Sequence, residues 1–420
     1  MKWNKSLIVL AAIMSSGIAQ DSDPLKMVLD VNPEVKAAEL GYKSALENVK
    51  VAGVLPDPML ENSFSINSIE TRNGPIENQI MLGQKFPLWG KLRRERNIQK
   101  IRADISKLNL ENVKVKISFL LRKHLAEYSK LTESLLILEN YREELETFQA
   151  IAQSQYANGM GLTQHPIIKL QIEESLVESQ LNAIESSLEK SNNNLQVLFN
   201  GLFSDDLFDR DLRQNINSMS KEYWLNLAHQ QNQAFAQAQA LVAIASDQIK
   251  LAKLKNYPDL ITGMTYSFVG PTEFAGAGSS GTDALGVKAG INIPLWFKKN
   301  RAKVKSASYG QKQQVENLSD VWNKIESDIL SILKELNEIN DTYKLYDESI
   351  IFETDQMLSS AYAAYETGKI SFLDLLDSVR LGVKVKLEFE NIKAKQTTLV
   401  ARLYQTTGLI NRNQENYNEN

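Results

Sequence analysis

The chain has 420 residues, of which 43% are hydrophobic and 23% charged, and its formal net charge is −4. This composition excludes a disordered chain and a polytopic helical membrane protein. The near-neutral charge and the lack of a basic block argue against a nucleic-acid partner. Because the sequence has no cysteine, we expect no disulfide, no thiolate metal site and no lipid anchor on an N-terminal cysteine.

The start of the chain, residues 1–19, has the pattern of a secretory signal peptide. Lys2 and Lys5 supply positive charge, and an apolar run of residues 7–14 follows them. That run is shorter than the roughly 18 residues of a membrane-spanning helix, which argues against the alternative of a membrane anchor. We expect cleavage before Gln20.

The sequence contains an internal repeat. We place the first copy at residues 20–210, a polar and irregular linker at 211–231, the second copy at 232–410 and a disordered tail at 411–420. Matching segments occur in the same order in both copies, which is the mark of a duplicated unit. They are Leu55-Pro56-Asp57 with Tyr257-Pro258-Asp259, Phe86-Pro87-Leu88-Trp89 with Ile293-Pro294-Leu295-Trp296, and Tyr156-Ala157-Asn158-Gly159 with Tyr365-Glu366-Thr367-Gly368.

Each copy predicts a helix, two strands, a very long helix, a tight turn and another long helix, so the fold class is mainly α with a small β part. The first helices are expected at 33–54 and 232–255, and the strands at 59–69, 77–87, 260–270 and 284–294. The long helices are expected at 91–158 and 297–366. A helix of that size is about 100 Å long, whereas helices of globular proteins run about 8–20 residues.

The long helices carry heptad stripes of apolar side chains, which predict coiled-coil packing. In the second copy the stripe consists of Leu318, Trp322, Ile325, Ile329, Ile332, Leu336, Ile339, Tyr343, Tyr346 and Ile350. In the first copy it consists of Leu121, Leu125, Tyr128, Leu131, Leu135, Leu138, Tyr141, Leu145 and Phe148. The core of an ordinary helical bundle would give the same stripe, but the helix length argues against that alternative.

The predicted strands alternate between apolar and polar residues, as in residues 285–293. This pattern fits a membrane barrel, but it also fits an amphipathic sheet on a soluble core, and the strands taken alone favour the soluble sheet. Four strands cannot close a barrel, and an open edge cannot lie in lipid. A membrane-spanning barrel would therefore require several copies of the chain.

The duplicated segments, with Asn-Pro-Glu at 32–34 and Gly-Gln-Lys-Phe-Pro-Leu-Trp-Gly-Lys at 83–91, resemble the TolC-like outer-membrane efflux family over residues 24–410. Leu-Pro-Asp-Pro-Met at 55–59 resembles its heavy-metal efflux branch. The resemblance implies a homotrimer with a 12-stranded barrel in outer-membrane lipid and a helical tunnel in the periplasm. It also implies two partners, a periplasmic adaptor and an inner-membrane pump that is proton-driven, with the duct itself passive.

Two tip turns are candidate adaptor contacts under this resemblance; their residues are Tyr156, Gly159, Thr163, Tyr365, Gly368 and Ser371. The glycines fit a helix C-terminus, and Thr163 and Ser371 fit an N-cap, so pure turn chemistry is the alternative for these residues.

Asp374 and Asp377, three residues apart on one helix face, are the candidate periplasmic constriction, where three copies would form a ring of carboxylates. The alternative is that early acidic residues simply favour a helix N-terminus. Ile370 lies where TolC has a basic gating residue, so the closed-state latch is expected to differ.

Pro87, Trp89, Pro294 and Trp296 mark the two strand-to-helix junctions. The tryptophans fit either the membrane–water boundary or burial at the junction.

The histidines, His124, His165 and His229, lack ligand spacing, so no metal site is predicted. We find no phosphate-binding or nucleotide motif and expect neither an enzyme nor a cofactor. The competing hypothesis is a periplasmic coiled-coil adaptor or spacer without a channel, because long heptads fit both.

Overall fold

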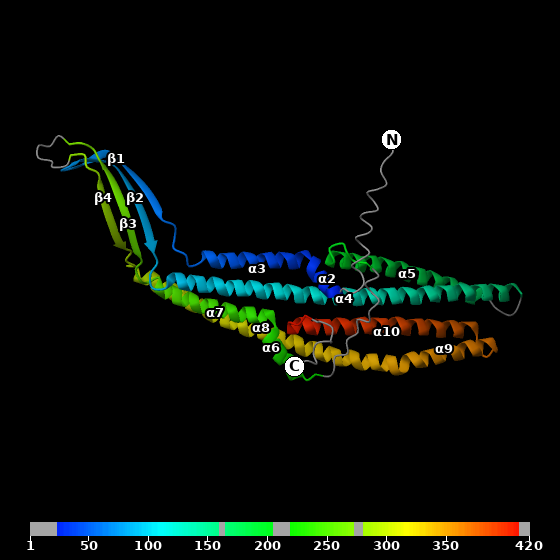
Figure 1. Cartoon of the computed structure of the whole chain (residues 1–420). Coiled ribbons are helices and arrows are strands. Elements are labelled where there is room, and N and C mark those ends of the chain that lie inside the picture. The colour runs from blue at the N-terminus through cyan, green and yellow to red at the C-terminus, as the bar shows by residue number, and fades with distance from the viewer. Residues whose placement is uncertain (1–22, 159–163, 205–218, 273–279, 411–420) are drawn as a thin grey trace, which may run out of the picture. The chain divides into compact units, whose positions relative to one another are not determined.

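The computed structural model describes residues 23–158, 164–204, 219–272 and 280–410. These residues form long helices and one four-stranded sheet, which confirms the mainly α prediction (Figure 1). The first half of the chain contains α2 (Pro24–Val31), α3 (Pro33–Val51), β1 (Met59–Thr71), β2 (Gly74–Phe86), α4 (Lys91–Ala157) and α5 (Gln164–Leu198). The second half contains α6 (Lys221–Gln231), α7 (Gln233–Leu254), β3 (Leu260–Val269), β4 (Ala284–Ile291), α8 (Phe297–Leu345), the π-helix η2 (Tyr346–Ile350), α9 (Ile351–Glu366) and α10 (Phe372–Thr407).

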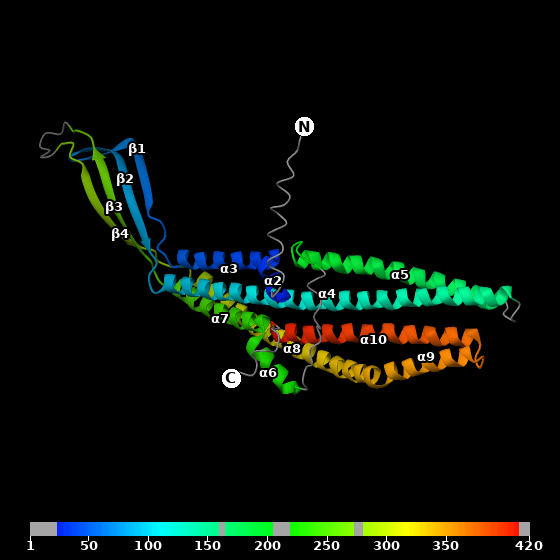
Figure 2. The same ribbon diagram turned by 45° about the vertical axis from the view of Figure 1, so that its right-hand side comes forward.

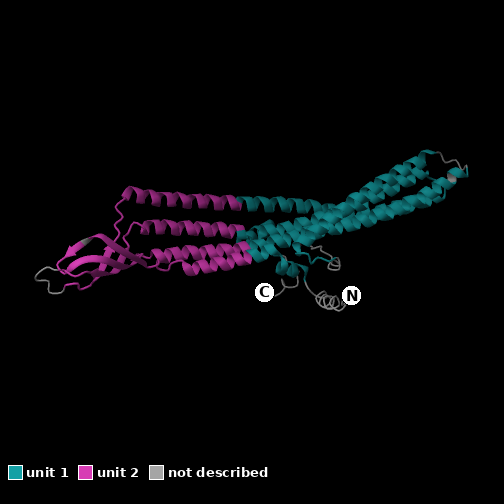
Figure 3. Ribbon diagram, turned by 90° about the horizontal axis from the view of Figure 1, so that it is seen from above, with its two compact units in different colours: residues 1–37, 111–233, 323–420 teal, residues 38–110, 234–322 magenta. Residues whose placement is uncertain are grey.

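The chain divides into two compact units, coloured separately in Figure 3. Unit 1 comprises residues 1–37, 111–233 and 323–420, and unit 2 comprises residues 38–110 and 234–322. Each unit draws on both halves of the sequence. The sheet lies in unit 2, and the turn that joins α9 to α10 lies in unit 1.

The sheet of unit 2 is antiparallel, with strand order β1-β2-β3-β4 (Figure 2). β2 pairs with β3 from Ile76 opposite Val269 to Phe86 opposite Leu260. This pairing joins the first half of the sequence to the second. β1 and β4 each pair on one side only, so they are the two edge strands.

Unit 1 is built around an apolar core near the turns between its long helices. In Figures 1 and 2, α9 runs beside α10, and the end of α4 runs beside α5. The core side chains share near-complete burial and come from all four helices; they include Leu138, Tyr141, Leu145, Phe148, Leu170, Val177, Leu181, Phe372, Leu375, Leu376 and Val379. The edge-to-face contact of Phe148 with Phe372, at 5.6 Å between ring centroids, joins the two helix pairs.

Most of the first predicted heptad stripe is buried, and so is the middle part of the second. In α8 the residues Ile325, Ile329, Ile332, Leu336 and Ile339 are buried, and in α4 the stripe from Leu121 to Phe148 is buried apart from half-buried Tyr128 and Leu135. The second stripe does not run through one α-helix as predicted, because the π-helix at Tyr346–Ile350 interrupts it. A π turn adds a residue to the helix and so rotates the stripe that follows.

The prediction of an irregular linker at 211–231 was wrong in its second part, because residues 221–231 form α6. Ser220 caps this helix by accepting a hydrogen bond from the Tyr223 N–H, and the ring of Trp224 packs edge-on against Tyr404. The short helix α2 was also not predicted. The predicted signal at 1–19 and tail at 411–420 lie outside the described residues.

Candidate functional site

One face of the sheet carries apolar side chains that are exposed. Neighbouring strands place them in rows, such as Leu60–Leu82–Met264–Val287, because each pairs directly with the next. Every member of this row is exposed, and Val287 is 79% exposed. The opposite face carries mainly polar and small residues, with Met81 and Ile261 as exceptions, and there Gln79 donates a hydrogen bond to Ser267.

This distribution is the reverse of a sheet that packs on a soluble core, where the apolar face is the buried one. Within the described residues of unit 2, no element covers the apolar face, whereas Thr265 and Ser267 on the polar face are buried. The soluble sheet that the strands alone favoured was therefore wrong. An exposed apolar face of this kind marks contact with lipid or with another protein surface.

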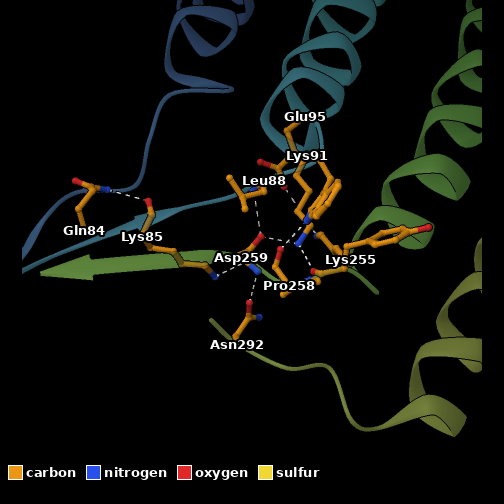
Figure 4. Close-up of polar contacts among 11 residues, drawn as sticks. Gln84, Lys85, Leu88, Lys91, Glu95, Lys255, Pro258, Asp259 and Asn292 are labelled. Carbon is orange, nitrogen blue, oxygen red and sulfur yellow. Dashed lines mark hydrogen bonds and ion pairs between the residues drawn. The ribbon is translucent and has the colours of Figure 1, made fainter. Parts of the chain in front are cut away.

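The junction between β2 and α4 is a second distinctive site, and it centres on the carboxylate of Asp259 at the start of β3 (Figure 4). The ammonium group of Lys91 lies 2.6 Å from Oδ1, and that of Lys85 lies 3.3 Å from Oδ2. The backbone N–H of Leu88 donates to Oδ1, and the N–H of Asp259 itself donates to Oδ1 of Asn292. Through its carboxylate and its backbone N–H, Asp259 thus ties together the ends of three strands and the start of a helix.

Burial of Asp259 would raise the pKa of its carboxyl, but the hydrogen bonds from Lys91 and Lys85 outweigh burial and lower it below the usual value. The carboxylate is therefore charged at neutral pH. Next to it, Trp89 has a left-handed backbone with φ 66°, and its indole N–H donates to the Pro258 carbonyl at 2.9 Å. The ring lies 5.5 Å from that of Tyr257.

The corresponding junction between β4 and α8 is more exposed to solvent. Trp296 is 74% exposed, whereas Trp89 is 57% exposed while bound to Pro258. Neither indole is buried in the single chain, so burial at the junction, one of the two alternatives for these rings, does not hold there. Pro87 and Pro294 lie between strand and helix, as expected from their lack of an N–H donor.

The turn from α9 to α10 is fully described in unit 1. Gly368 has φ 69°, its N–H donates to the Tyr365 carbonyl, and the Lys369 N–H donates to the Ala364 carbonyl. This is a Schellman termination. Ser371 then caps α10 in a reciprocal capping box with Asp374. Ile370 packs against the apolar core of unit 1, while Gly159 and Thr163 of the other turn lie outside the described residues.

Asp374 and Asp377 are both exposed on α10. Hydrogen bonds from Ser371 hold the pKa of Asp374 below its usual value. Asp377 lies 3.2 Å from Lys169 of α5 and 3.1 Å from Arg380, so each acid has a local structural role. Arg380 in turn lies 3.6 Å from buried Glu173, whose carboxylate accepts a hydrogen bond from Tyr141.

The sequence profile described as "Outer membrane efflux protein" matches residues 25–201 and 224–409. The chain belongs to the outer membrane efflux protein family. Membership makes it an efflux channel protein of the outer membrane, and the family is one of channels rather than enzymes. No curated protein sequence matches the chain.

Solved structures of outer membrane channels share the fold of this family member. CusC, in a study of its folding and transmembrane channel formation, has a TM-score of 0.74 at 15% identity, covering 94% of this chain and 96% of its own. The CmeC outer membrane channel of Campylobacter jejuni gives 0.73 at 16%, covering 91% and 85%. VceC of Vibrio cholerae gives 0.72 at 17%, covering 91% and 95%. At these identities the likeness establishes the fold.

In the described part of this efflux protein, no helix is both long and apolar enough to cross a bilayer. Nor do three or more histidine, aspartate or glutamate side chains there gather as a metal site would require; His124, His165 and His229 lie on α4, α5 and α6.

Sequence reasoning missed two buried acidic residues of the efflux protein, Asp259 and Glu173. Asp259 was noticed only as part of a repeated segment, because its partner Lys91 is 168 positions away. Glu173 was not singled out. A buried acid in an otherwise apolar helical stripe could have been suspected, since such residues are rarely buried without partners.

Proposed function

We propose that three copies of the chain form a passive exit duct through the outer membrane. In this duct the apolar sheet face contacts lipid, and twelve strands, four from each copy, close one barrel. The observation that carries the proposal is the sheet itself, with an exposed apolar face and two edge strands that pair on one side only. A free edge in lipid leaves backbone groups unpaired, and this cost disappears when the edges of neighbouring copies join.

We further propose that the long helices of unit 1 line a periplasmic tunnel that meets two partners. A periplasmic adaptor would contact the turns at Tyr156 and Tyr365, and a proton-driven inner-membrane pump would supply the energy. Exposed Tyr156 and the well-formed Schellman turn at Gly368 support a stable surface for such contact.

The carboxylates of Asp374 and Asp377 would form the narrow entrance of the duct. Both are exposed in the single chain, and the lowered pKa of Asp374 keeps that group charged at neutral pH. Six carboxylates around an axis would attract cations and repel anions. Since Asp377 is already paired with Lys169 and Arg380, we expect Asp374 to contribute more of the free negative charge.

Membrane fractionation tests this proposal. We expect the protein to require detergent for extraction from the outer membrane and to run as a trimer that heating converts to a monomer. Release as a monomer into the soluble periplasmic fraction would contradict it and favour a coiled-coil spacer.

A further inference from the structure

The sheet end of unit 2 contains two ion pairs that link the first half of the sequence to the second. Lys91, the first residue of α4, binds Asp259 at 2.6 Å. One turn further along α4, Arg94 lies 3.1 Å from Asp247 of α7. Both carboxylates are buried, and both pairs lie just beyond the paired strands β2 and β3.

Each of these four residues has a counterpart in the other half of the sequence. Lys298 and Arg301 follow Trp296 at the same distances at which Lys91 and Arg94 follow Trp89. Asp57 follows Pro56 as Asp259 follows Pro258. Glu47 forms an i,i+3 ion pair with Lys50 at 2.7 Å, as Asp247 does with Lys250 at 3.3 Å.

The counterparts are exposed and do not meet within one chain. Glu47, Asp57, Lys298 and Arg301 are all exposed, and among the described residues Asp57, Lys298 and Arg301 make no side-chain hydrogen bond or ion pair. Asp57 precedes β1 and Lys298 follows β4, which are the two opposite edges of the sheet. A second copy of this chain fits both sets of exposed residues, because its residues near β4 can meet the residues near β1.

The register expected between β4 of one copy and β1 of the next follows from the register between β2 and β3 within one chain. Ile80 lies seven residues before Pro87 and pairs with Tyr266, which lies seven residues after Asp259. The residues at the same positions in β4 and β1 are Val287, seven before Pro294, and Phe64, seven after Asp57. An equivalent contact therefore places Val287 of one copy opposite Phe64 of the next.

This register places apolar side chains opposite each other on the apolar face of the sheet. It sets Val287 opposite Phe64, Leu285 opposite Ile66 and Ile291 opposite Leu60, and all six side chains are exposed in the single chain. A slip of one residue would turn one member of each pair to the polar face, so the apolar pattern selects this register over its neighbours.

We propose that neighbouring copies are locked at this junction by two ion pairs, Lys298 to Asp57 and Arg301 to Glu47, with Val287 opposite Phe64 in the adjoining strands. The inference rests on the proposed function, because it needs a second copy. It goes further by naming the residues that hold the copies in register.

The junction between β4 and α8 does not reproduce the junction between β2 and α4 in every respect. Gly90, with φ 81°, corresponds to Phe297, for which a left-handed backbone is costly. In addition, α8 begins at Phe297, one position earlier than α4 begins relative to its lysine. The proposal is therefore confined to the side-chain pairs and the strand register.

Charge reversal tests the ion pairs. We expect Lys298→Asp and Asp57→Lys each to raise the rate of trimer dissociation on heating roughly tenfold, because like charges then face each other across copies. The double variant D57K/K298D should recover most of the wild-type rate. Lys299→Asp is the matched control, since it makes the same charge change at an adjacent exposed position outside the pair.

Cysteine cross-linking tests the register without depending on stability. The chain has no native cysteine, so a disulfide can come only from the introduced pair. We expect Phe64→Cys with Val287→Cys to give covalent dimers and trimers on oxidation. Phe64→Cys with Ile291→Cys, on the same face but about 13 Å out of register, should not.

The inference is overturned if the single reversals behave like K299D, if the double variant is no better than the singles, or if only the out-of-register pair cross-links. A wild-type protein that never assembles would instead contradict the proposed function itself, so the two failures are distinguishable.

Discussion

The ammonium group of Lys91 lies 2.6 Å from the carboxylate of Asp259, although 168 positions separate the two residues in the sequence. Both side chains are more than 90% buried. A buried ion pair gives little net stability relative to apolar residues, but losing one partner leaves an uncompensated charge. The pair therefore fixes where α4 begins relative to β3 within unit 2.

Replacing Lys91 by methionine keeps the apolar stem and removes the charge. We expect a loss of about 3–5 kcal/mol in the free energy of unfolding, because Asp259 stays buried with weaker partners. Lys85→Met is the matched control, since Lys85 is half exposed and lies farther away, at 3.3 Å. Its loss should be about 0–1 kcal/mol. Urea unfolding of the detergent-solubilised protein measures both, and equal losses would contradict the assignment.

The lowered pKa of Asp247 leads to a prediction of how stability depends on pH. Burial would raise the pKa of this carboxyl, but hydrogen bonds from Asn97 and Lys250 and the charge of Arg94 lower it overall. A lowered folded pKa stabilises the protein above the unfolded value of about 3.9, and the contribution disappears as pH falls through the folded pKa. The difference in urea midpoint between wild type and Asp247→Asn should thus be constant from pH 7 to 5 and shrink only below about pH 4. Shrinkage between pH 7 and 5 would mean a raised pKa instead.

Alanine substitutions at two glycines should change the stability of the protein in opposite directions. Gly368→Ala should destabilise unit 1 by roughly 1–2 kcal/mol, because the residue has φ 69° at the end of α9. Gly310→Ala, inside α8, should stabilise by about 0.5–1 kcal/mol, because a Cβ there would meet nothing within 4 Å. Thermal unfolding followed by circular dichroism compares them, and a shift of the same sign in both variants would refute the turn assignment.

Tyr141 and Glu173 form a buried hydrogen bond of 3.0 Å between α4 and α5. Burial raises the pKa of the Tyr141 hydroxyl, so it remains a donor. Tyr141→Phe should cost about 1.5–3 kcal/mol, as expected for a lost hydrogen bond to a charged group. Tyr156→Phe, at an exposed ring, should change stability by less than about 0.5 kcal/mol. If both variants unfold at the same urea concentration, the buried bond has no such role.

The strands and long helices could be predicted from sequence because their periods differ. Alternation placed the four strands to within about three residues at each end, and the absence of glycine and proline placed α4 to within one residue. Burial of Ile329 and Ile332 confirms the heptad stripe that predicted them. The short helices α2 and α6 were missed, because about two or three turns carry too little periodicity to detect.

The junction could not be predicted, for a different reason. Lys91 and Asp259 meet only because β2 pairs with β3, and a pairing between distant strands leaves no mark on local sequence. The π-helix at Tyr346–Ile350 was hidden as well, since the steps from Tyr343 to Tyr346 and Ile350 fit a continuous heptad equally well. The acids at 374 and 377 were recognised, but their bonds to Ser371 and Lys169 required the structure.

Single-channel recording in a planar lipid bilayer tests the central claim most directly. We expect the purified trimer to give discrete, cation-selective conductance steps. We also expect Asp374→Asn with Asp377→Asn to raise the conductance or to change block by cations, because the carboxylates of the proposed entrance are lost. A folded trimer that inserts but conducts no ions would contradict the account of this protein as an exit duct.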